Sequence, residues 1–138
     1  MTTSRPIGSL LLELPGAEPL AGAGDATVRA VENDSRNARP GTLFVAVPGF
    51  NFDGHSFLPA VVQSGAGAMV VQRDRPAAWG DLPSGPAVIV VDDTRAALSA
   101  AAAWFYGHPG REMTVGGVTG TDGKTTTSHL LTSVLAAG

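Results

Sequence analysis

The segment Leu43-Phe44-Val45-Ala46-Val47-Pro48-Gly49 decides the fold class. Its five consecutive apolar residues indicate a strand that is buried on both faces, and the Pro-Gly pair ends this strand in a turn. Apolar runs of the same kind recur at 68–71 and 87–91, and a strand of period two is expected at 27–31. Strands that are apolar on both faces are typical of parallel sheets that helices cover.

Helical patterns alternate with these strands. The first begins after Ser56, which is expected as its N-cap, and carries apolar residues at helical spacing. The second, Thr94–Tyr106, is the clearest helix of the chain, with Asp93 or Thr94 as its cap and Gly107 at its end. Strand, helix and strand in succession predict an α/β fold with a small, mostly parallel sheet covered by helices.

The composition is that of an ordinary globular protein and argues against several classes of function. The chain has 138 residues, of which 43% are hydrophobic, and 12 acidic against 9 basic residues give a formal net charge of −3. A negative charge without a basic run argues against binding to nucleic acid. No apolar run approaches the ~18 residues of a membrane span. The absence of cysteine excludes disulfides, a thiolate nucleophile and Cys-ligated metal sites, and it agrees with a cytoplasmic location.

Several other residues are expected to have structural roles. The apolar stretch 7–14 is interrupted by a glutamate, so an amphipathic turn that packs on the core is expected rather than a secretion signal. Asp34 and Arg36 are expected either to form a local salt bridge or to belong to a binding site. His55 is expected to be a hydrogen-bonded structural histidine, and the pair Asp92-Asp93 is expected to cap the helix that follows it.

The strongest chemical signal is the segment Val118–Thr127, which reads Val-Thr-Gly-Thr-Asp-Gly-Lys-Thr-Thr-Thr. It ends an apolar run at Met113–Val118, expected as a strand, and it opens a helix expected at Lys124–Ala137, which is the context of a phosphate loop. Glycines let successive backbone N–H groups point at an anion, and the helix N-terminus adds about half a positive charge. Lys124, the only lysine of the chain, can reach the β- and γ-phosphates of a nucleotide, and the Thr125 hydroxyl can ligate Mg²⁺.

Two features of this segment depart from the usual pattern. Val118 occupies the position of the first glycine of the long phosphate-loop pattern, so only the shorter form Gly-x-x-Gly-Lys-Thr remains. Asp122 places a carboxylate inside the loop, where it repels phosphate unless it faces the metal, an arginine or solvent. It is expected either to ligate the metal indirectly or to cap the helix. The alternative for the whole segment is a glycine-rich turn with a solvated lysine.

Several motifs together resemble one known family. The loop at Thr119–Thr127 is similar to the ATP loop of the Mur ligases of peptidoglycan synthesis, and segments before it look like the N-terminal domain of those enzymes. These segments are Asp34-Ser35-Arg36, Pro40–Gly49, Asp53–Phe57, Gly65–Ala68 and Phe105–Pro109. The last of them is most similar to the UDP-N-acetylmuramoyl-tripeptide synthetases, the MurE type.

The resemblance implies an ATP-dependent carboxylate–amine ligase. The γ-phosphate of ATP activates a carboxylate of a UDP-N-acetylmuramoyl-peptide as an acyl phosphate, which the amine of an amino acid displaces; ATP and Mg²⁺ are the implied cofactors. The residues expected to bind ATP are Gly120, Thr121, Asp122, Gly123, Lys124, Thr125 and Thr126, and Thr125 is also expected on Mg²⁺. Those expected to bind the UDP part of the substrate are Asn33, Ser35, Phe50, Asn51 and Phe52. Amide, hydroxyl and aromatic groups suit a nucleotide because they can hydrogen-bond to it or stack on it.

The same resemblance divides the chain and leaves alternatives open. Residues 1–111 are expected to form the UDP-substrate-binding N-terminal domain, and residues 112–138 the beginning of a truncated ATP-binding domain. The metal-binding carboxylates of the family are therefore expected outside this chain, and the chain alone is expected not to catalyse ligation. The tripeptide Phe50–Phe52 is closer to the MurF type, which adds the terminal dipeptide. The runs Asp34–Arg36 and Phe105–Pro109 and the triple threonine Thr125–Thr127 favour the MurE type. A non-catalytic nucleotide-binding module of the same fold is the third alternative.

Overall fold

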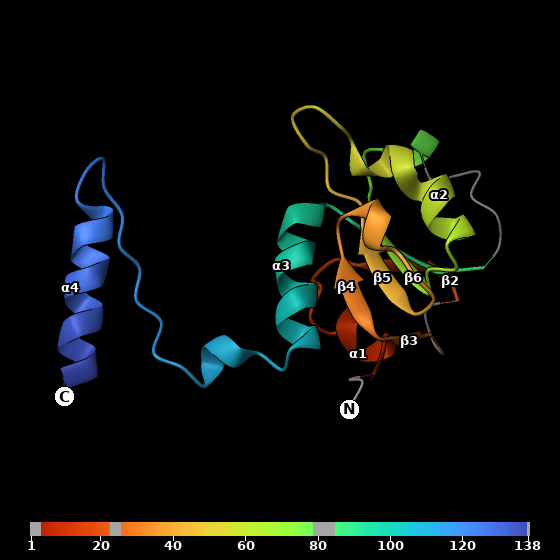
Figure 1. Cartoon of the computed structure of the whole chain (residues 1–138). Coiled ribbons are helices and arrows are strands. Elements are labelled where there is room, and N and C mark those ends of the chain that lie inside the picture. Colours follow the sequence, from red (N-terminus) through yellow and green to blue (C-terminus); the bar gives the residue numbers. More distant parts are fainter. Residues whose placement is uncertain (1–3, 23–25, 79–84, 138) are drawn as a thin grey trace. The chain divides into compact units, whose positions relative to one another are not determined.

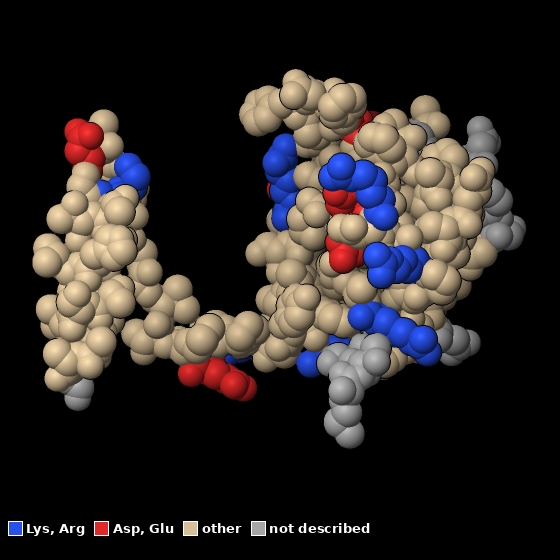
Figure 2. Space-filling model, in the orientation of Figure 1, with Lys and Arg blue, Asp and Glu red and all other residues tan. Residues whose placement is uncertain are grey.

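The computed structural model describes residues 4–22, 26–78 and 85–137. The chain divides into two compact units, Met1–His108 and Pro109–Gly138. Within the described residues, no helix is long and apolar enough to cross a membrane. On the visible face of the first unit, basic side chains form small separate groups, some of them beside acidic side chains (Figure 2).

The centre of the first unit is a five-stranded sheet with the strand order β2-β7-β6-β5-β4 (Figure 1). Its strands are β2 (Glu18–Ala21), β4 (Ala30–Glu32), β5 (Thr42–Val45), β6 (Ala68–Gln72) and β7 (Ala87–Val91). The neighbours β4, β5, β6 and β7 run parallel, and β2 pairs antiparallel with β7 at one edge. The predicted small, mostly parallel sheet is therefore confirmed.

Side chains of the sheet alternate between two buried faces, as the apolar runs predict. On one face, residues such as Leu43, Val70 and Ile89 pack with the helices α1 (Gly8–Leu11) and α3 (Thr94–Phe105). On the other face, Phe44, Met69 and Val71 pack with the helix α2 (Leu58–Gln63). The sheet is thus a middle layer between helices (Figure 1). The apolar stretch 7–14 packs into the first of these clusters, so its predicted role on the core is confirmed.

The strand predicted at 27–31 is divided in two at Arg29. Its first part, β3 (Thr27–Val28), pairs antiparallel with β1 (Arg5–Pro6), and only the second part, β4, joins the main sheet beside β5. The edge strand β2 contains Pro19, a residue that a central strand does not accept, and the sequence pattern therefore missed it. Arg73 connects this edge to the rest of the sheet, because its guanidinium donates to Glu18 Oε2 at 2.7 Å and to Asp92 Oδ1 at 2.8 Å.

The 3₁₀ segment that leads into α2 and the helix α3 both begin at an aspartate rather than at a hydroxyl residue. Asp53 caps the short 3₁₀ helix η2 (Gly54–Phe57) that leads into α2, so the prediction of Ser56 as the cap is wrong. Asp93 accepts hydrogen bonds from the backbone N–H groups of Arg95 and Ala96, which confirms it as the cap of α3. A carboxylate in this position satisfies free N–H groups of the first turn and complements the helix dipole.

Helix α3 ends at a glycine, as predicted. Gly107 has φ +79°, its N–H donates to Trp104 O at 3.2 Å, and the N–H of His108 donates to Ala103 O at 2.7 Å. These two bonds form a Schellman motif, in which the left-handed residue after the helix is normally a glycine. The segment between β6 and β7 contains a short 3₁₀ turn, η3 (Pro76–Ala78), and residues 79–84 lie outside the described part of the chain.

The second unit contains a 3₁₀ turn, η4 (Pro109–Arg111), and the helix α4 (Lys124–Ala137). The predicted helix is confirmed with the same bounds. The strand predicted at Met113–Val118 is wrong, because these residues form no ladder in the structure. A strand needs a neighbour to receive its backbone hydrogen bonds, and the described residues of this unit contain no second strand.

Candidate functional site

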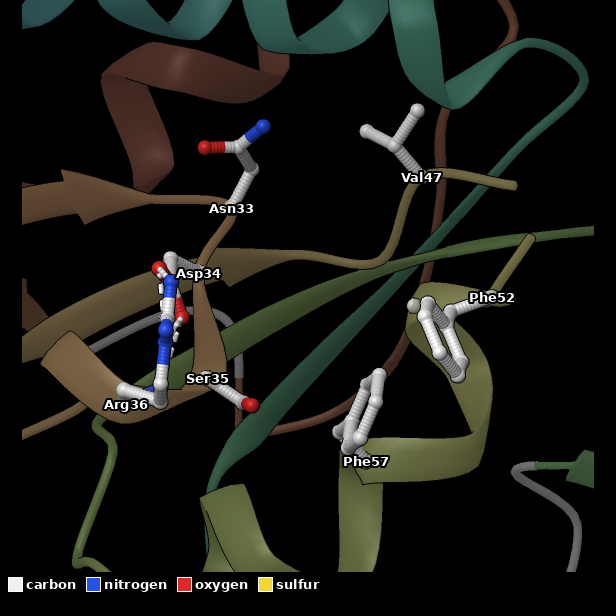
Figure 3. A pocket seen from close by; sticks show the side chains of 8 residues that line it. Asn33, Asp34, Ser35, Arg36, Val47, Phe52 and Phe57 are labelled. Carbon is white, nitrogen blue, oxygen red and sulfur yellow. Dashed lines mark hydrogen bonds and ion pairs between the residues drawn. The ribbon is translucent and has the colours of Figure 1, made fainter. Parts of the chain in front are cut away.

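A pocket of about 460 Å³ lies in the first unit, where the chain leaves the carboxyl ends of β4 and β5 (Figure 3). Loops from neighbouring parallel strands gather at this edge of an α/β sheet, which is the usual place of ligand sites in such folds. The residues that line the pocket are Asn33, Asp34, Ser35, Arg36, Val47, Phe52, Gly54 and Phe57. Three of the five residues expected to bind UDP, namely Asn33, Ser35 and Phe52, are among them.

One wall of the pocket is the short connection between β4 and β5. It contains the 3₁₀ turn η1 (Ser35–Asn37), which Asp34 caps by accepting the N–H of Arg36 at 3.0 Å. The guanidinium of Arg36 also donates hydrogen bonds to the same carboxylate. Nε lies 2.9 Å from Oδ1 and 3.1 Å from Oδ2, and Nη2 lies 2.5 Å from Oδ2. The predicted local salt bridge is therefore confirmed.

The ion pair of Asp34 with Arg36 determines the net charge of this wall of the pocket. The side-chain and backbone hydrogen bonds from Arg36 lower the pKa of the Asp34 carboxyl to about 2, so it is ionised at neutral pH. Because Arg36 compensates that charge, the pair contributes no net charge to the pocket. The neutral groups beside it are available to a ligand: the amide of Asn33 and the hydroxyl of Ser35 make no hydrogen bond within the described residues.

Two aromatic rings form the opposite side of the pocket (Figure 3). Phe52 is 74% exposed and Phe57 is 39% exposed, although burial of such rings is favourable. Sequence reasoning missed Phe57, because its spacing with the apolar residues of α2 indicated a residue of the core. Its half-exposed ring beside an exposed Phe52 is a signal that only the structure provides.

The loop Pro48–Asp53, here called the pocket loop, carries Phe52 to this position. Gly49 N donates to Phe52 O at 2.9 Å, which leaves Phe50 and Asn51 at an exposed tip. Phe50 and Asn51, although expected to bind UDP, do not line the pocket. The base of the loop requires a glycine, since a Cβ on Gly54 would lie 2.7 Å from the backbone nitrogen of Val47.

A buried histidine lies below the pocket loop. His55 is 1% exposed; its Nδ1 lies 2.6 Å from Asp53 Oδ1, and its Nε2 accepts the backbone N–H of Gln72 at 2.9 Å. Because that N–H can only donate, the ring proton resides on Nδ1 and is shared with Asp53. The predicted role of His55 as a hydrogen-bonded structural histidine is thus confirmed.

In the hydrogen-bonded pair of Asp53 and His55, the aspartate carries the charge. Burial raises the pKa of its carboxyl, but the hydrogen bonds from the backbone and ring of His55 and the charge of Arg75 outweigh it, so the net shift is downward. Asp53 also accepts a hydrogen bond from Arg75 Nη1. The carboxylate therefore remains ionised and links the pocket loop to two other parts of the unit.

The loop before α4 has local features of a phosphate site. Gly123 has φ +76°, which favours glycine, and the ammonium of Lys124 donates to the carbonyl oxygens of Gly120 and, at 3.3 Å, of Thr121. The lysine thus lies over the loop in which phosphates are expected. Thr125 and Thr126 are exposed in the first turn of α4. Asp122 is exposed as well, and its carboxylate makes no hydrogen bond or ion pair within the described part of the chain.

The sequence profile of the Mur ligase family, catalytic domain, matches residues 27–106. The chain belongs to the Mur ligase family. The matched range includes every residue that lines the pocket, whereas the loop at 119–127 lies outside it. The profile match of this Mur ligase chain therefore lies in the first unit and does not include the phosphate-loop motif.

Relatives of this Mur ligase chain are longer proteins. It is 48% identical over 111 residues to the UDP-N-acetylmuramyl-tripeptide synthetase of a Roseiflexus species, covering 80% of this chain and 21% of that protein. It is 42% identical over 126 residues to the UDP-N-acetylmuramoyl-L-alanyl-D-glutamate–2,6-diaminopimelate ligase of Geobacillus thermodenitrificans, covering 91% of this chain and 24% of that protein. The chain thus spans about a quarter of the length of the curated relatives it matches.

Solved structures of the family have the same fold. A crystal structure of MurF from Acinetobacter baumannii superimposes with a TM-score of 0.66 at 29% identity, and the match covers 97% of this chain and 28% of that protein. A second crystal structure of MurF from the same organism gives a TM-score of 0.55 over 73% of this chain. The Mur ligase chain therefore shares its architecture with a MurF-type enzyme, and its sequence is more similar to the two relatives named above.

Proposed function

We propose that this chain is the uridine-nucleotide-binding part, with the start of the ATP-binding part, of an ATP-dependent ligase. The ligase joins an amino acid to a UDP-N-acetylmuramoyl-peptide in peptidoglycan synthesis. The observation that carries this proposal is the pocket at the ends of β4 and β5, which brings Asn33, Ser35 and Phe52 together. The names of the similar proteins give the chemical class of the substrate. A cytoplasmic location remains the expectation for such an enzyme.

Each group of the pocket has a role that suits a nucleotide. The free amide of Asn33 and hydroxyl of Ser35 can hydrogen-bond to the polar edge of uracil or to a phosphate oxygen. The rings of Phe52 and Phe57 offer apolar faces for the base, and stacking of a base on an aromatic ring contributes about 1–3 kcal/mol in nucleic-acid sites. The ion pair of Asp34 with Arg36 orients the turn that carries Ser35.

The second unit would hold the nucleotide triphosphate. The residues proposed for ATP are Gly120, Thr121, Asp122, Gly123, Lys124, Thr125 and Thr126, with Thr125 at the Mg²⁺ ion. Backbone N–H groups and the ammonium of Lys124 would bind the phosphates, and bound ATP supplies the phosphoryl group that activates the carboxylate. Without the rest of the enzyme these residues bind and orient only, so we expect no ligation by the 138-residue chain.

The MurE type is the specific activity that we favour. Both named relatives at more than 40% identity carry names of enzymes that make the tripeptide, and the MurF structures are 28–29% identical. The MurF type is the second candidate, because Phe50–Phe52 is closer to that type and the MurF fold superimposes over nearly the whole chain. Addition of diaminopimelate or lysine, rather than of a dipeptide, by an enzyme containing this chain would support the first candidate.

Calorimetric titration of the 138-residue chain with UDP tests the pocket. We expect Phe52→Ala to weaken UDP binding about tenfold, because a stacking face is lost, and Ser35→Ala to weaken it less. Phe50→Ala is the matched control, since it removes the same ring two residues away at a tip that does not line the pocket. Equal effects of Phe52→Ala and Phe50→Ala, or none from either, would contradict the proposed site.

A separate titration with ATP tests the second unit. In a longer protein that contains this chain, Lys124→Ala should weaken ATP binding about tenfold to a hundredfold, the loss typical of a hydrogen-bonded charge. Binding of UDP should remain unchanged, because Lys124 belongs to the other unit. Unchanged ATP binding would leave a nucleotide-binding module of the same fold as the better description of the chain.

A further inference from the structure

Two arginines from other elements hold the two ends of the pocket loop, Pro48–Asp53. At one end, Arg95 of the first turn of α3 donates from Nη2 to the carbonyl oxygen of Pro48. At the other end, Arg75, which follows β6, donates from Nη1 to Oδ2 of Asp53. Neither arginine lines the pocket.

The end at Asp53 is held by several contacts at once. One carboxylate oxygen accepts the backbone N–H of His55 at 3.0 Å and lies 2.6 Å from Nδ1 of its ring, and the other accepts from Arg75. His55 is in turn fixed to the sheet, because its Nε2 accepts the N–H of Gln72 at the end of β6. The charge of Asp53 thereby connects the pocket loop to the rigid centre of the unit.

Phe52 lies between these two points of attachment. It precedes Asp53 directly, and its carbonyl oxygen accepts the N–H of Gly49, next to Pro48. Its ring has little support of its own, since it is 74% exposed. Its position opposite Ser35 therefore depends on how firmly the two ends of the loop are fixed (Figure 3).

We propose that Arg75 and Arg95 are positioning residues that hold Phe52 in the orientation in which it binds the uridine nucleotide. This inference rests on the proposed function of the pocket. A loop that is already ordered loses less conformational entropy when a ligand binds, so the two arginines raise nucleotide affinity without touching the nucleotide. Their effect passes through Phe52 and disappears when the Phe52 ring is absent.

The experiment is a double-mutant cycle on UDP affinity, measured by calorimetry on the 138-residue chain. Arg95→Met should weaken binding of UDP about three- to tenfold, and Arg95→Lys should restore most of it, because an ammonium can still donate to Pro48 O. In the Phe52→Ala background, Arg95→Met should cause no further loss. Arg75→Met is the second arm, and Arg75→Lys is its conservative partner.

Two controls separate positioning from charge and from stability. Arg29→Met removes the same charge from an exposed residue at the amino end of β4, away from the pocket, and should leave UDP affinity unchanged. Thermal unfolding should change little in Arg95→Met, because this arginine is exposed and exposed polar contacts contribute little to stability. If Arg75→Met fails to fold, the Arg95 arm alone decides the outcome.

The possible outcomes are distinct. Loss of affinity in Arg95→Met that vanishes without Phe52 supports the positioning role. Weakened binding in Phe52→Ala together with unchanged binding in Arg95→Met, or with fully additive losses, overturns the positioning role and leaves the proposed function standing. Unchanged binding in Phe52→Ala overturns the proposed function of the pocket and the positioning role with it.

Discussion

Helices α3 and α4 have similar lengths and similar proportions of small residues, but they differ in what their apolar residues contact. The 12 residues of α3 include five buried ones, among them Trp104 and Phe105, which pack on the sheet. The 14 residues of α4 include no buried residue, and Leu130, Leu131, Val134 and Leu135 are exposed. The first unit is therefore stabilised by tertiary packing. The notable features of the second unit are local, namely the backbone geometry of its loop and the contacts of Lys124.

The difference explains why the family profile and the phosphate-loop motif lie in different units of the chain. The family match at 27–106 falls on the packed unit, where many positions are constrained by the core. The phosphate-loop motif falls on the other unit, where few residues carry all of the chemistry. The phosphate-loop motif therefore predicts a ligand, whereas the residues of the packed unit identify the family.

Substitutions in the two helices give the largest expected contrast. Trp104→Ala should lower the free energy of unfolding by about 3–5 kcal/mol, because it removes a core ring that is 3% exposed. The indole N–H also donates to Ser9 Oγ at 2.9 Å. The matched Leu131→Ala in α4 should change it by at most about 0.5 kcal/mol. Urea unfolding followed by circular dichroism measures both, and equal losses would contradict the comparison.

The base of the pocket loop should be nearly as sensitive. Gly54→Ala places a Cβ at 2.7 Å from Val47 N and 2.9 Å from Val47 O, so we expect a loss of about 1–3 kcal/mol in stability and weaker UDP binding. Gly110→Ala is the control in the second unit, since its Cβ would meet no atom within 4 Å. A Gly54→Ala variant as stable as Gly110→Ala would show that this approach of the two backbones does not constrain the loop.

Acid should affect the first unit through Asp53. The folded-state pKa of this carboxyl lies below its ordinary value of 3.8, so its stabilising contribution is fully present above pH 3.8 and is lost as the pH falls through the lower folded value. We expect a contribution below about 1 kcal/mol, because the side chain is partly exposed. Asp53→Asn should remove this part of the pH dependence, which urea unfolding between pH 2 and 5 would measure. An unchanged pH profile in Asp53→Asn would assign the acid sensitivity to other carboxyls.

The smallest effect is expected from removing residues 109–138. Both hydrophobic clusters consist of residues of the first unit, so its melting temperature should change by no more than about 2 °C, and its affinity for UDP should not change. Differential scanning calorimetry and titration of the shortened chain measure these quantities. A large drop in either would mean that the second unit contributes to the stability or to the pocket of the first.

The elements that the sequence predicts well are those whose signal is local. The apolar runs at β6 and β7 and the glycine that ends α3 depend on adjacent residues only. Burial and strand pairing depend on residues that are distant in the sequence, and for this reason the prediction from the sequence was wrong about two strands. Residues Met113–Val118 have the pattern of a strand without a neighbour to pair with, and β2 is a strand in spite of Pro19 because β7 lies beside it.

The pocket residues likewise include some that the sequence predicted correctly and some that it did not. Motif positions led to Asn33, Ser35 and Phe52, which the structure brings together. The same tripeptide also led to Phe50 and Asn51, which the turn of the loop carries to the tip. Phe57 was missed because helical spacing cannot distinguish a core ring from one at the end of a helix with one face open.

The two glycines of the pocket loop have a practical consequence. A Cβ on Gly49 would lie 2.6 Å from Phe52 O, and one on Gly54 would meet the backbone of Val47, so both positions tolerate only glycine. Between them, Phe50 and Asn51 project into solvent and support no other part of the unit. The tip can therefore be varied without loss of stability: substitutions of Phe50 and Asn51 should leave both the fold of the first unit and the pocket intact.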